Sequence, residues 1–161
     1  MIKVLVTGGA GYIGSHAVYA LLDKEYDVCV VDNLSTGIRE NLPSDIKFYQ
    51  EDIANYDAVS KILSFERPDA VMHFAGSIVV PESVTNPIKY YQNNTAASLN
   101  LIHACIDNNV KHFIFSSTAA VYGVPRSDAP ITEESTLTPI NPYGQSKLMT
   151  EYVLRDCAFA Y

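Results

Sequence analysis

The chain has 161 residues, which is enough for one domain that buries its own core. Its net charge of −7 at pH 7 argues against sequence-independent binding to nucleic acid, although backbone N–H groups can still hold a phosphate-bearing ligand. No stretch approaches the ~18 apolar residues of a membrane span, and the first apolar run is too short for a signal peptide. The three cysteines form no C-x-x-C pair, so we expect no metal site and no disulfide. We expect all three to be reduced and buried, as in a cytoplasmic protein.

A glycine-rich turn follows the first apolar run, which covers residues 2–7 and predicts a buried strand. Its sequence is Thr7-Gly8-Gly9-Ala10-Gly11-Tyr12-Ile13-Gly14, and residues 12–24 then show helical spacing. Two frames overlap, one with Gly9, Gly11 and Gly14 and the other with Gly8, Gly11 and Gly14. Either frame predicts a tight turn whose backbone N–H groups bind a pyrophosphate at the start of a helix.

An acidic residue, Asp32, ends the second predicted strand at residues 27–32. The strand, turn, helix and strand form a βαβ unit with a right-handed crossover. Asp32 follows Gly14 by 18 residues, roughly where a carboxylate accepts hydrogen bonds from an adenosine ribose. Such a carboxylate repels a 2′-phosphate, so NAD is favoured over NADP. A solvated aspartate at a strand end is the alternative interpretation.

Three more strands are predicted at residues 46–49, 70–74 and 112–116. Helices are predicted from Asn55 to the residue before Arg67, over residues 88–107, and from Asn141 onward. Residues 81–87 read as irregular, and residues 123–141 as an exposed, mobile loop. Five strands alternating with helices predict an α/β fold, a Rossmann-like, doubly wound parallel sheet.

Several polar residues stand out in these elements. His73 lies in an apolar strand and reads as a core histidine rather than a catalytic one. Asn93-Asn94 is unfavourable inside a helix, so we expect one of the pair to make a polar contact. Asp52 and Ile53 follow the third strand, where they either contact an adenine or belong to an ordinary loop.

A second constellation, Tyr143 and Lys147, stands one helical turn apart on the last predicted helix. A nearby lysine cation favours the phenolate of a tyrosine, which can then take a proton from a sugar hydroxyl and return it. Ser116, Ser117 and Thr118 leave the carboxyl end of the fifth strand, the edge where α/β sheets collect ligands. Thr118 can therefore share a hydrogen bond with the same substrate oxygen.

Together these motifs resemble the extended short-chain dehydrogenase/reductase family, and most closely its UDP-hexose 4-epimerase branch. The matching stretches are Thr7 to Gly14, Asp32-Asn33, Asp52-Ile53, His73-Phe74-Ala75-Gly76, Ser116-Ser117-Thr118, Val121-Tyr122-Gly123 and Tyr143-x-x-x-Lys147. Related dehydratases carry an acidic pair where Ala119 and Ala120 stand here, so no dehydration acid is supplied.

The resemblance implies an enzyme that holds NAD tightly and epimerises C4 of UDP-glucose and UDP-galactose through a 4-keto sugar. By this resemblance Tyr143 exchanges the proton of the 4-hydroxyl, Thr118 positions the 4-oxygen, and Lys147 favours the phenolate and bonds the nicotinamide ribose. It implies that NAD contacts Gly8, Gly11, Tyr12, Ile13, Gly14, Asp32, Asn33, Asp52, Ile53, Phe74, Ala75, Gly76, Asn93 and Ser116, together with Tyr143 and Lys147.

Two departures from the family pattern affect these expectations. Ser77-Ile78 replaces a segment in which many epimerases carry a cofactor-binding lysine. Family members also continue for about as many residues again, so we expect residues 1–161 to be a partial, NAD-binding Rossmann-type domain, truncated before the nucleotide-sugar domain. Alone it is expected to have little epimerase activity. The resemblance also implies a full-length homodimer formed through the helices near Leu99 and Tyr152.

Other functions are compatible with the same residues. Epimerases of UDP-xylose and UDP-arabinose, of UDP-glucuronate or of N-acetylated UDP-hexoses are near alternatives. A non-catalytic NAD-binding protein would not need the Tyr143–Lys147 pair. A reductase that exchanges free NADPH is disfavoured by Asp32.

Overall fold

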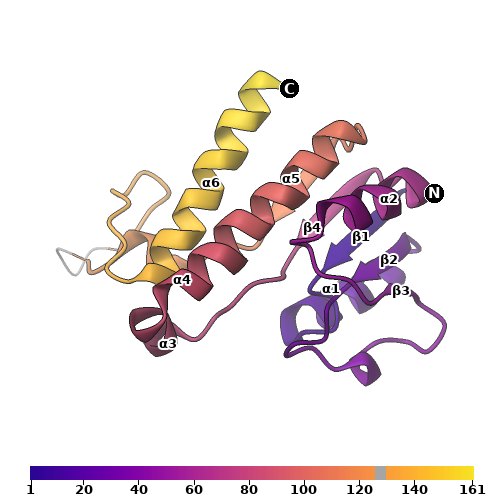
Figure 1. Cartoon of the computed structure of the whole chain (residues 1–161), viewed down its shortest axis with the longest axis horizontal. Coiled ribbons are helices and arrows are strands. Elements are labelled where there is room, and N and C mark those ends of the chain that lie inside the picture. The colour runs from indigo at the N-terminus through magenta and orange to yellow at the C-terminus, as the bar shows by residue number, and fades with distance from the viewer. Residues whose placement is uncertain (126–129) are drawn as a thin grey trace. The chain divides into compact units, whose positions relative to one another are not determined.

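The computed structural model describes residues 1–125 and 130–161, and the chain divides into two compact units. Unit 1 comprises Met1–Gly76 and Asn100–Ser116, and unit 2 comprises Ser77–Leu99 and Ser117–Tyr161. Figure 1 shows both units and labels most of their helices and strands. Among the described residues, no helix is both long and apolar enough to span a membrane.

Unit 1 is built on a five-stranded parallel sheet. Its strands are β1 (Lys3–Thr7), β2 (Asp27–Val31), β3 (Lys47–Tyr49), β4 (Ala70–His73) and β5 (His112–Phe115). Their order across the sheet is β3-β2-β1-β4-β5, and every neighbouring pair is parallel. The sheet therefore grows from β1 in one direction and then in the other, which confirms the predicted Rossmann-like, doubly wound α/β fold.

Helices cover both faces of this sheet. They are α1 (Tyr12–Leu22), α2 (Tyr56–Glu66) and, from Asn100 onward within this unit, α5 (Ala97–Asp107); a 3-10 turn, η1 (Arg39–Asn41), precedes β3. Right-handed crossovers put α1 on one face and α2 on the other, because the chain changes its direction across the sheet between them. Figure 1 shows α1 and α2 on opposite sides of the strands. Asn55 caps α2 by accepting a hydrogen bond from the Ala58 amide, as predicted.

The three central strands, β1, β2 and β4, are buried on both faces, as the strands of parallel sheets usually are, whereas the edge strands β3 and β5 are partly exposed. Val4 and Val6 of β1 pack in one apolar cluster with Val18 of α1, while Leu5 between them points to the opposite face and is fully buried. His73 is also fully buried, and its Nδ1 lies 2.7 Å from the Thr7 hydroxyl oxygen. The prediction of a core histidine is confirmed.

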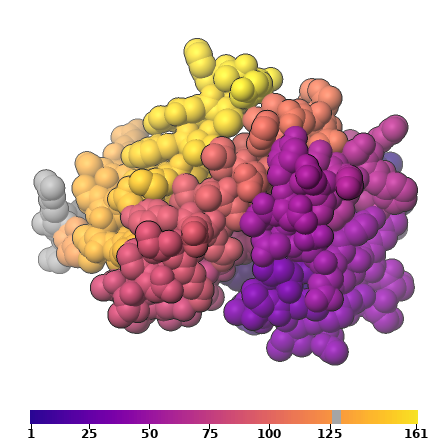
Figure 2. Space-filling view, in the orientation of Figure 1, coloured from indigo at the N-terminus to yellow at the C-terminus, as the bar shows by residue number. Residues whose placement is uncertain are grey.

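The three cysteines were expected to be reduced and buried, and only two of them are buried. All three are free thiols, and Cys29 and Cys105 are buried. Cys157 is only partly buried, which corrects the expectation for that residue. It lies in the last turns of α6 (Pro142–Ala160), drawn in yellow in Figure 2, where the neighbouring residues Arg155, Asp156 and Phe159 are exposed.

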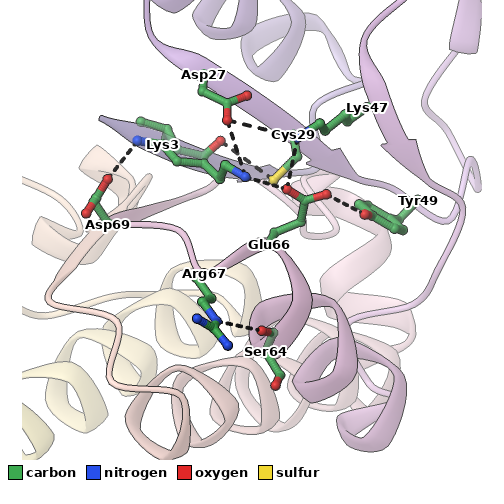
Figure 3. Close-up of polar contacts among 10 residues, drawn as sticks. Lys3, Asp27, Cys29, Lys47, Tyr49, Ser64, Glu66, Arg67 and Asp69 are labelled. Carbon is green, nitrogen blue, oxygen red and sulfur yellow. Dashed lines mark hydrogen bonds and ion pairs between the residues drawn. The ribbon is translucent and has the colours of Figure 1, made fainter. Parts of the chain in front are cut away.

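A charged network closes the amino-terminal edge of the sheet in unit 1 (Figure 3). Its centre is the carboxylate of Glu66, the last residue of α2, which is only 4% exposed. The carboxylate accepts hydrogen bonds from Lys3 Nζ at 2.7 Å, Lys47 Nζ at 3.3 Å and the Tyr49 hydroxyl at 2.6 Å. Burial alone would raise the pKa of Glu66, but these three donors lower it below its ordinary value. The network thereby ties the end of α2 to β1 and β3.

Unit 2 consists of helices, and two of its segments differ from the prediction. Residues 81–87 do not form an irregular stretch, since α3 (Val80–Thr85) begins with Pro81 in its first turn and α4 (Pro87–Tyr90) begins with Pro87. Proline favours a first helical turn, where its missing N–H is not needed. The helix predicted over residues 88–107 is divided into α4, a π-helix η2 (Tyr91–Ala96) and α5.

The carboxy-terminal part of unit 2 holds a 3-10 turn, η3 (Ala119–Tyr122), and the long helix α6. Asn141 caps α6 by accepting the Gly144 amide at 2.8 Å, and Pro142 stands in the first turn, as predicted. Residues 123–125 and 130–141 contain neither helix nor strand. Residues 126–129 of the loop expected to be mobile lie outside the described residues.

Candidate functional site

In the glycine turn of unit 1, backbone atoms leave no room for a side chain at two positions. Gly8 follows β1 with a φ of +69°, and a Cβ there would lie 2.4 Å from the Ala75 nitrogen. A Cβ on Gly14 would lie 2.2 Å from the Gly8 carbonyl oxygen. At both positions the obstacle is a backbone atom. A Cβ on Gly9 would instead lie 2.6 Å from the Val30 side chain. A Cβ on Gly11 would lie 3.2 Å from the Gly8 carbonyl oxygen, which is a longer contact. The geometry favours the frame that begins at Gly8.

The start of α1 presents backbone N–H groups without a side-chain cap. Gly11 is its N-cap and makes no side-chain capping bond. The next two side chains, Tyr12 and Ile13, are 80% and 59% exposed. An uncapped helix start beside a close-packed glycine turn is a site that suits an anionic pyrophosphate.

Asp32 leaves β2 next to this turn and is held rigidly. Its Oδ2 accepts the Ala10 amide at 2.9 Å, and its Oδ1 accepts the Leu34 amide at 2.8 Å. The adjacent Asn33 donates from its side-chain amide to Asp52 Oδ2 at 2.9 Å, which brings the ends of β2 and β3 together. Ile53 is 5% exposed, so its side chain mainly fills the core.

The other predicted cofactor residues of unit 1 lie at the same carboxyl edge of the sheet. The Phe74 amide donates to Thr7 O at 2.9 Å, and Ala75 is the residue that closely approaches Gly8. The Ser116 amide donates to His73 O at 3.1 Å, which aligns the ends of β4 and β5. Gly76 completes the segment after Ala75. The turn, the acidic strand ends and these residues thus belong to one edge, as the fold requires.

Tyr143 and Lys147 lie in unit 2, in the first turns of α6. Tyr143 is half-buried, whereas Lys147 is 4% exposed. Burial lowers the pKa of Lys147 to about 8. The side chain is therefore still mainly an ammonium at pH 7, in surroundings that screen its charge less than water does. Close packing fixes this end of α6, because a Cβ on Gly144 would lie 2.7 Å from Ala120 O.

Thr118, in the same unit, caps the 3-10 turn η3. Its hydroxyl oxygen accepts the Ala120 amide at 3.1 Å, so its proton is available to a second acceptor. The neighbouring Ser117 hydroxyl donates to the Glu151 carboxylate of α6. These bonds hold the segment after β5 in a defined conformation.

The asparagine pair of η2 makes the polar contacts expected of it, and both members take part. Asn94 is 1% exposed; its Oδ1 accepts the Ser77 amide at 2.7 Å, and its Nδ2 donates to Ser77 O at 3.0 Å and to Ser146 Oγ at 3.1 Å. Asn93 donates to Ser77 Oγ at 2.9 Å. The resemblance assigned Asn93 to the cofactor, and the sequence predicted a polar contact for one of the pair without identifying which. The partners of Asn94 were not predicted.

Within residues 1–125 and 130–161, no cluster of three or more histidine, cysteine, aspartate or glutamate side chains could hold a metal ion. The residues that the sequence singled out for chemistry are thus the glycine turn with the strand ends in unit 1, and Thr118, Asn93, Tyr143 and Lys147 in unit 2.

Comparisons with known proteins agree with this set of features. Residues 4–161 match the model of the NAD dependent epimerase/dehydratase family. A UDP-glucose 4-epimerase of Azospirillum brasilense is 53% identical over 159 residues, which are 99% of this chain and 45% of the relative. A putative UDP-arabinose 4-epimerase 2 of Arabidopsis thaliana is 47% identical, over 95% of this chain and 39% of the relative.

Solved structures show the same similarity. The UDP-glucose 4-epimerase of Brucella ovis in complex with NAD has a TM-score of 0.96 and 43% identity, over 100% of this chain and 49% of that one. The UDP-Glc/GlcNAc 4-epimerase of Campylobacter jejuni has a TM-score of 0.95 and 47% identity, over 99% of this chain and 50% of that one. The chain spans about half the length of the curated relatives it matches. With the glycine turn, the parallel sheet and the match over residues 4–161, this chain belongs to the NAD dependent epimerase/dehydratase family.

Proposed function

We propose that the complete protein containing this chain epimerises C4 of a UDP-hexose, interconverting UDP-glucose and UDP-galactose through a 4-keto sugar with NAD as its cofactor. The observation that carries the proposal is the phenol of Tyr143 one helical turn from the buried ammonium of Lys147. A protein that only binds NAD has no need of a desolvated cation beside a phenol. The relatives named UDP-glucose 4-epimerase support the choice of reaction.

NAD fits the residues present in unit 1. The backbone cradle at Gly8 and Gly14, which a Cβ would fill, suits the close approach of a pyrophosphate, and the rigid Asp32 carboxylate suits a ribose diol. In this proposal the cofactor is held by Gly8, Gly11, Tyr12, Ile13, Gly14, Asp32, Asn33, Asp52, Ile53, Phe74, Ala75, Gly76, Asn93, Ser116, Tyr143 and Lys147. When bound, NAD supplies an acceptor and donor of hydride at the sugar C4.

The side chains of unit 2 supply the proton chemistry. Tyr143 removes the proton of the sugar 4-hydroxyl as C4 is oxidised, and returns it when C4 is reduced on the opposite face. The Lys147 ammonium stabilises the phenolate that this exchange requires, and its burial strengthens that effect. Thr118 donates its hydroxyl proton to the sugar 4-oxygen, because its own oxygen is already occupied by the Ala120 amide.

The test uses the complete protein with UDP-galactose as substrate and measures NAD by mass spectrometry of the denatured sample. Tyr143→Phe is expected to lower kcat at least about 100-fold, which is the usual contribution of a general acid–base group. The variant should still retain NAD, because the glycine turn and Asp32 of unit 1 are left intact. Tyr19→Phe is the matched control, since Tyr19 of α1 is 46% exposed and has no part in the proposed chemistry or dimer. Equal turnover in both variants would refute the proposal.

The identity of the sugar is the second part of the test. One relative is named as a putative UDP-arabinose 4-epimerase, and one similar structure as a UDP-Glc/GlcNAc 4-epimerase. A panel of UDP-arabinose, UDP-xylose, UDP-glucuronate and UDP-N-acetylglucosamine should therefore accompany UDP-galactose. A kcat/KM for one of these sugars well above that for UDP-galactose would reassign the substrate and leave the proton chemistry of Tyr143 in place.

We also propose a homodimer and a cytoplasmic location for the complete protein. Apolar or aromatic side chains of α5 and α6 are exposed, with Leu99 47% and Tyr152 41% exposed, and would be covered by a second copy. The three free cysteines suit a reducing compartment. Sedimentation velocity of the complete protein tests the dimer, and Leu99→Lys should dissociate it.

A further inference from the structure

We infer that Tyr90 is a positioning residue for Tyr143: its buried ring stands against the Tyr143 ring and fixes the direction of that phenol. This inference rests on the proposed function, in which Tyr143 exchanges a proton with the sugar. Both residues belong to unit 2, where Tyr90 is the last residue of α4 and Tyr143 lies in the first turn of α6.

Tyr90 is immobilised at both ends of its side chain. It is fully buried and heads the largest fully buried side chains of the described residues. Its hydroxyl lies 2.6 Å from the carbonyl oxygen of Val79 and 2.9 Å from Oε2 of Glu82. Glu82 is itself held by an ion pair of 2.5 Å with Lys89. A ring enclosed in this way can neither swing nor slide.

The two rings meet edge to face. Their centroids are 6.4 Å apart and their planes are inclined by 89°. This geometry lies within the range that aromatic pairs prefer, about 4.5–7 Å between centroids. Tyr143 is only half-buried, so solvent does not restrain its ring on the open side. The fixed ring of Tyr90 is an aromatic contact that limits the rotation of the Tyr143 ring.

A fixed direction matters for the proposed chemistry. A general base must stand within about 2.6–3.2 Å of the oxygen whose proton it takes. A displacement of about 1 Å can lower the rate about 100-fold. Burial, together with the hydrogen bond to Glu82, raises the pKa of Tyr90 to about 12. Tyr90 therefore stays neutral while Tyr143 changes its protonation state.

The experiment separates the ring of Tyr90 from its hydroxyl in the complete, NAD-loaded protein. Tyr90→Phe keeps the ring and should retain kcat within about threefold. Tyr90→Leu removes the ring and should lower kcat about 10- to 100-fold, with KM for UDP-galactose and NAD content within about twofold of wild type. Leu63→Ala, at a fully buried position of α2 in unit 1, is the control for lost stability and should keep kcat.

Each alternative outcome overturns the inference. Wild-type kcat in Tyr90→Leu would show that the ring contact is irrelevant. Equal losses in Tyr90→Phe and Tyr90→Leu would assign the effect to the hydroxyl and its partners instead. Equal losses in Leu63→Ala and Tyr90→Leu would reduce it to general destabilisation. Tyr90→Met, whose unbranched side chain fits irregular core space more readily than leucine, replaces Tyr90→Leu if that variant does not fold.

A second measurement does not depend on turnover. NMR relaxation of carbon-13-labelled tyrosine rings reports the mobility of Tyr143, whose signal is assigned by comparison with the Tyr143→Phe derivative. Tyr90→Leu should increase the mobility of the Tyr143 ring, and an unchanged mobility would overturn the inference. An increased mobility in a protein that converts no UDP-sugar would instead leave the inference standing and refute the proposed function.

Discussion

Burial of Lys147 should cost the protein stability at neutral pH. The side chain is 4% exposed, and burial lowers its pKa from the ordinary 10.5 to about 8. Between these two values the unfolded chain binds the proton and the folded chain does not. The free energy of unfolding therefore rises with pH over this interval, because stability increases wherever the unfolded state holds more protons.

The size of the effect follows from the two pKa values. Relative to a chain without this group, the folded state is penalised by about 3.3 kcal/mol at pH 7 and by about 0.8 kcal/mol at pH 10. From pH 7 to pH 10, the free energy of unfolding of wild type should therefore increase by about 2.5 kcal/mol relative to that of Lys147→Met. Methionine is a suitable replacement because it is unbranched, similar in length and uncharged.

Urea unfolding of wild type and of Lys147→Met without cofactor, at pH 7 and at pH 10, measures this relative change in the free energy of unfolding. Lys61→Met, which removes an exposed lysine of α2, is the control and should follow wild type at both pH values. A gain below about 0.5 kcal/mol for wild type over Lys147→Met would refute the argument, since the linkage relation allows no such cancellation. In the complete protein, Lys147→Met should also lower epimerase kcat at least about 100-fold.

Two further substitutions test the two edges of the sheet. Gly14→Ala places a Cβ 2.2 Å from Gly8 O, so it should lower the free energy of unfolding by about 1–3 kcal/mol and release most of the bound NAD. Gly11→Ala is the control: its Cβ lies 3.2 Å from Gly8 O, so urea unfolding should show a loss of less than about 1 kcal/mol. Glu66→Gln should cost about 1.5–3 kcal/mol at pH 7, because the carboxylate accepts charged donors there. Because the pKa of Glu66 is lowered in the folded state, wild type should lose this part of its free energy of unfolding as the pH falls through the folded-state pKa of Glu66. Acid unfolding of Glu66→Gln, followed by circular dichroism, should not show this pH-dependent loss.

Much of unit 1 could be predicted because its signals are local. Each strand is a short apolar run followed by a turn or helix signal, and alternation with helices determines a parallel sheet. The caps at Asn55 and Asn141 were predictable for the same reason, since each side chain bonds an amide three residues ahead. The short helix α3 was missed because Val79 and Val80 have weak helix propensity, and the proline-started turn relies on packing.

The division of the helix over residues 88–107 has a tertiary cause that no local pattern contains. A π-helix leaves carbonyl groups poorly paired along its own chain, and Asn94 O is satisfied by hydroxyls, from Ser98 at 2.6 Å and from Thr150 of α6 at 2.8 Å. Thr150 is 56 positions away in the sequence. The sequence therefore predicted that the asparagine pair makes a polar contact, but its partners depend on how α6 packs against η2.

The same distinction separates the groups proposed to do chemistry from those that hold them. Tyr143, Lys147, Thr118 and the glycine turn could be proposed from the sequence, because a reaction requires particular residue types at particular strand and helix ends. Asn94 is a different case: its amide is already satisfied by Ser77 and by Ser146, one residue before Lys147, which leaves it little capacity for a ligand. We conclude that Asn94 supports α6 rather than contacting the cofactor. A buried polar side chain in an apolar pattern indicates such support, while its partners become visible only when the chain is folded.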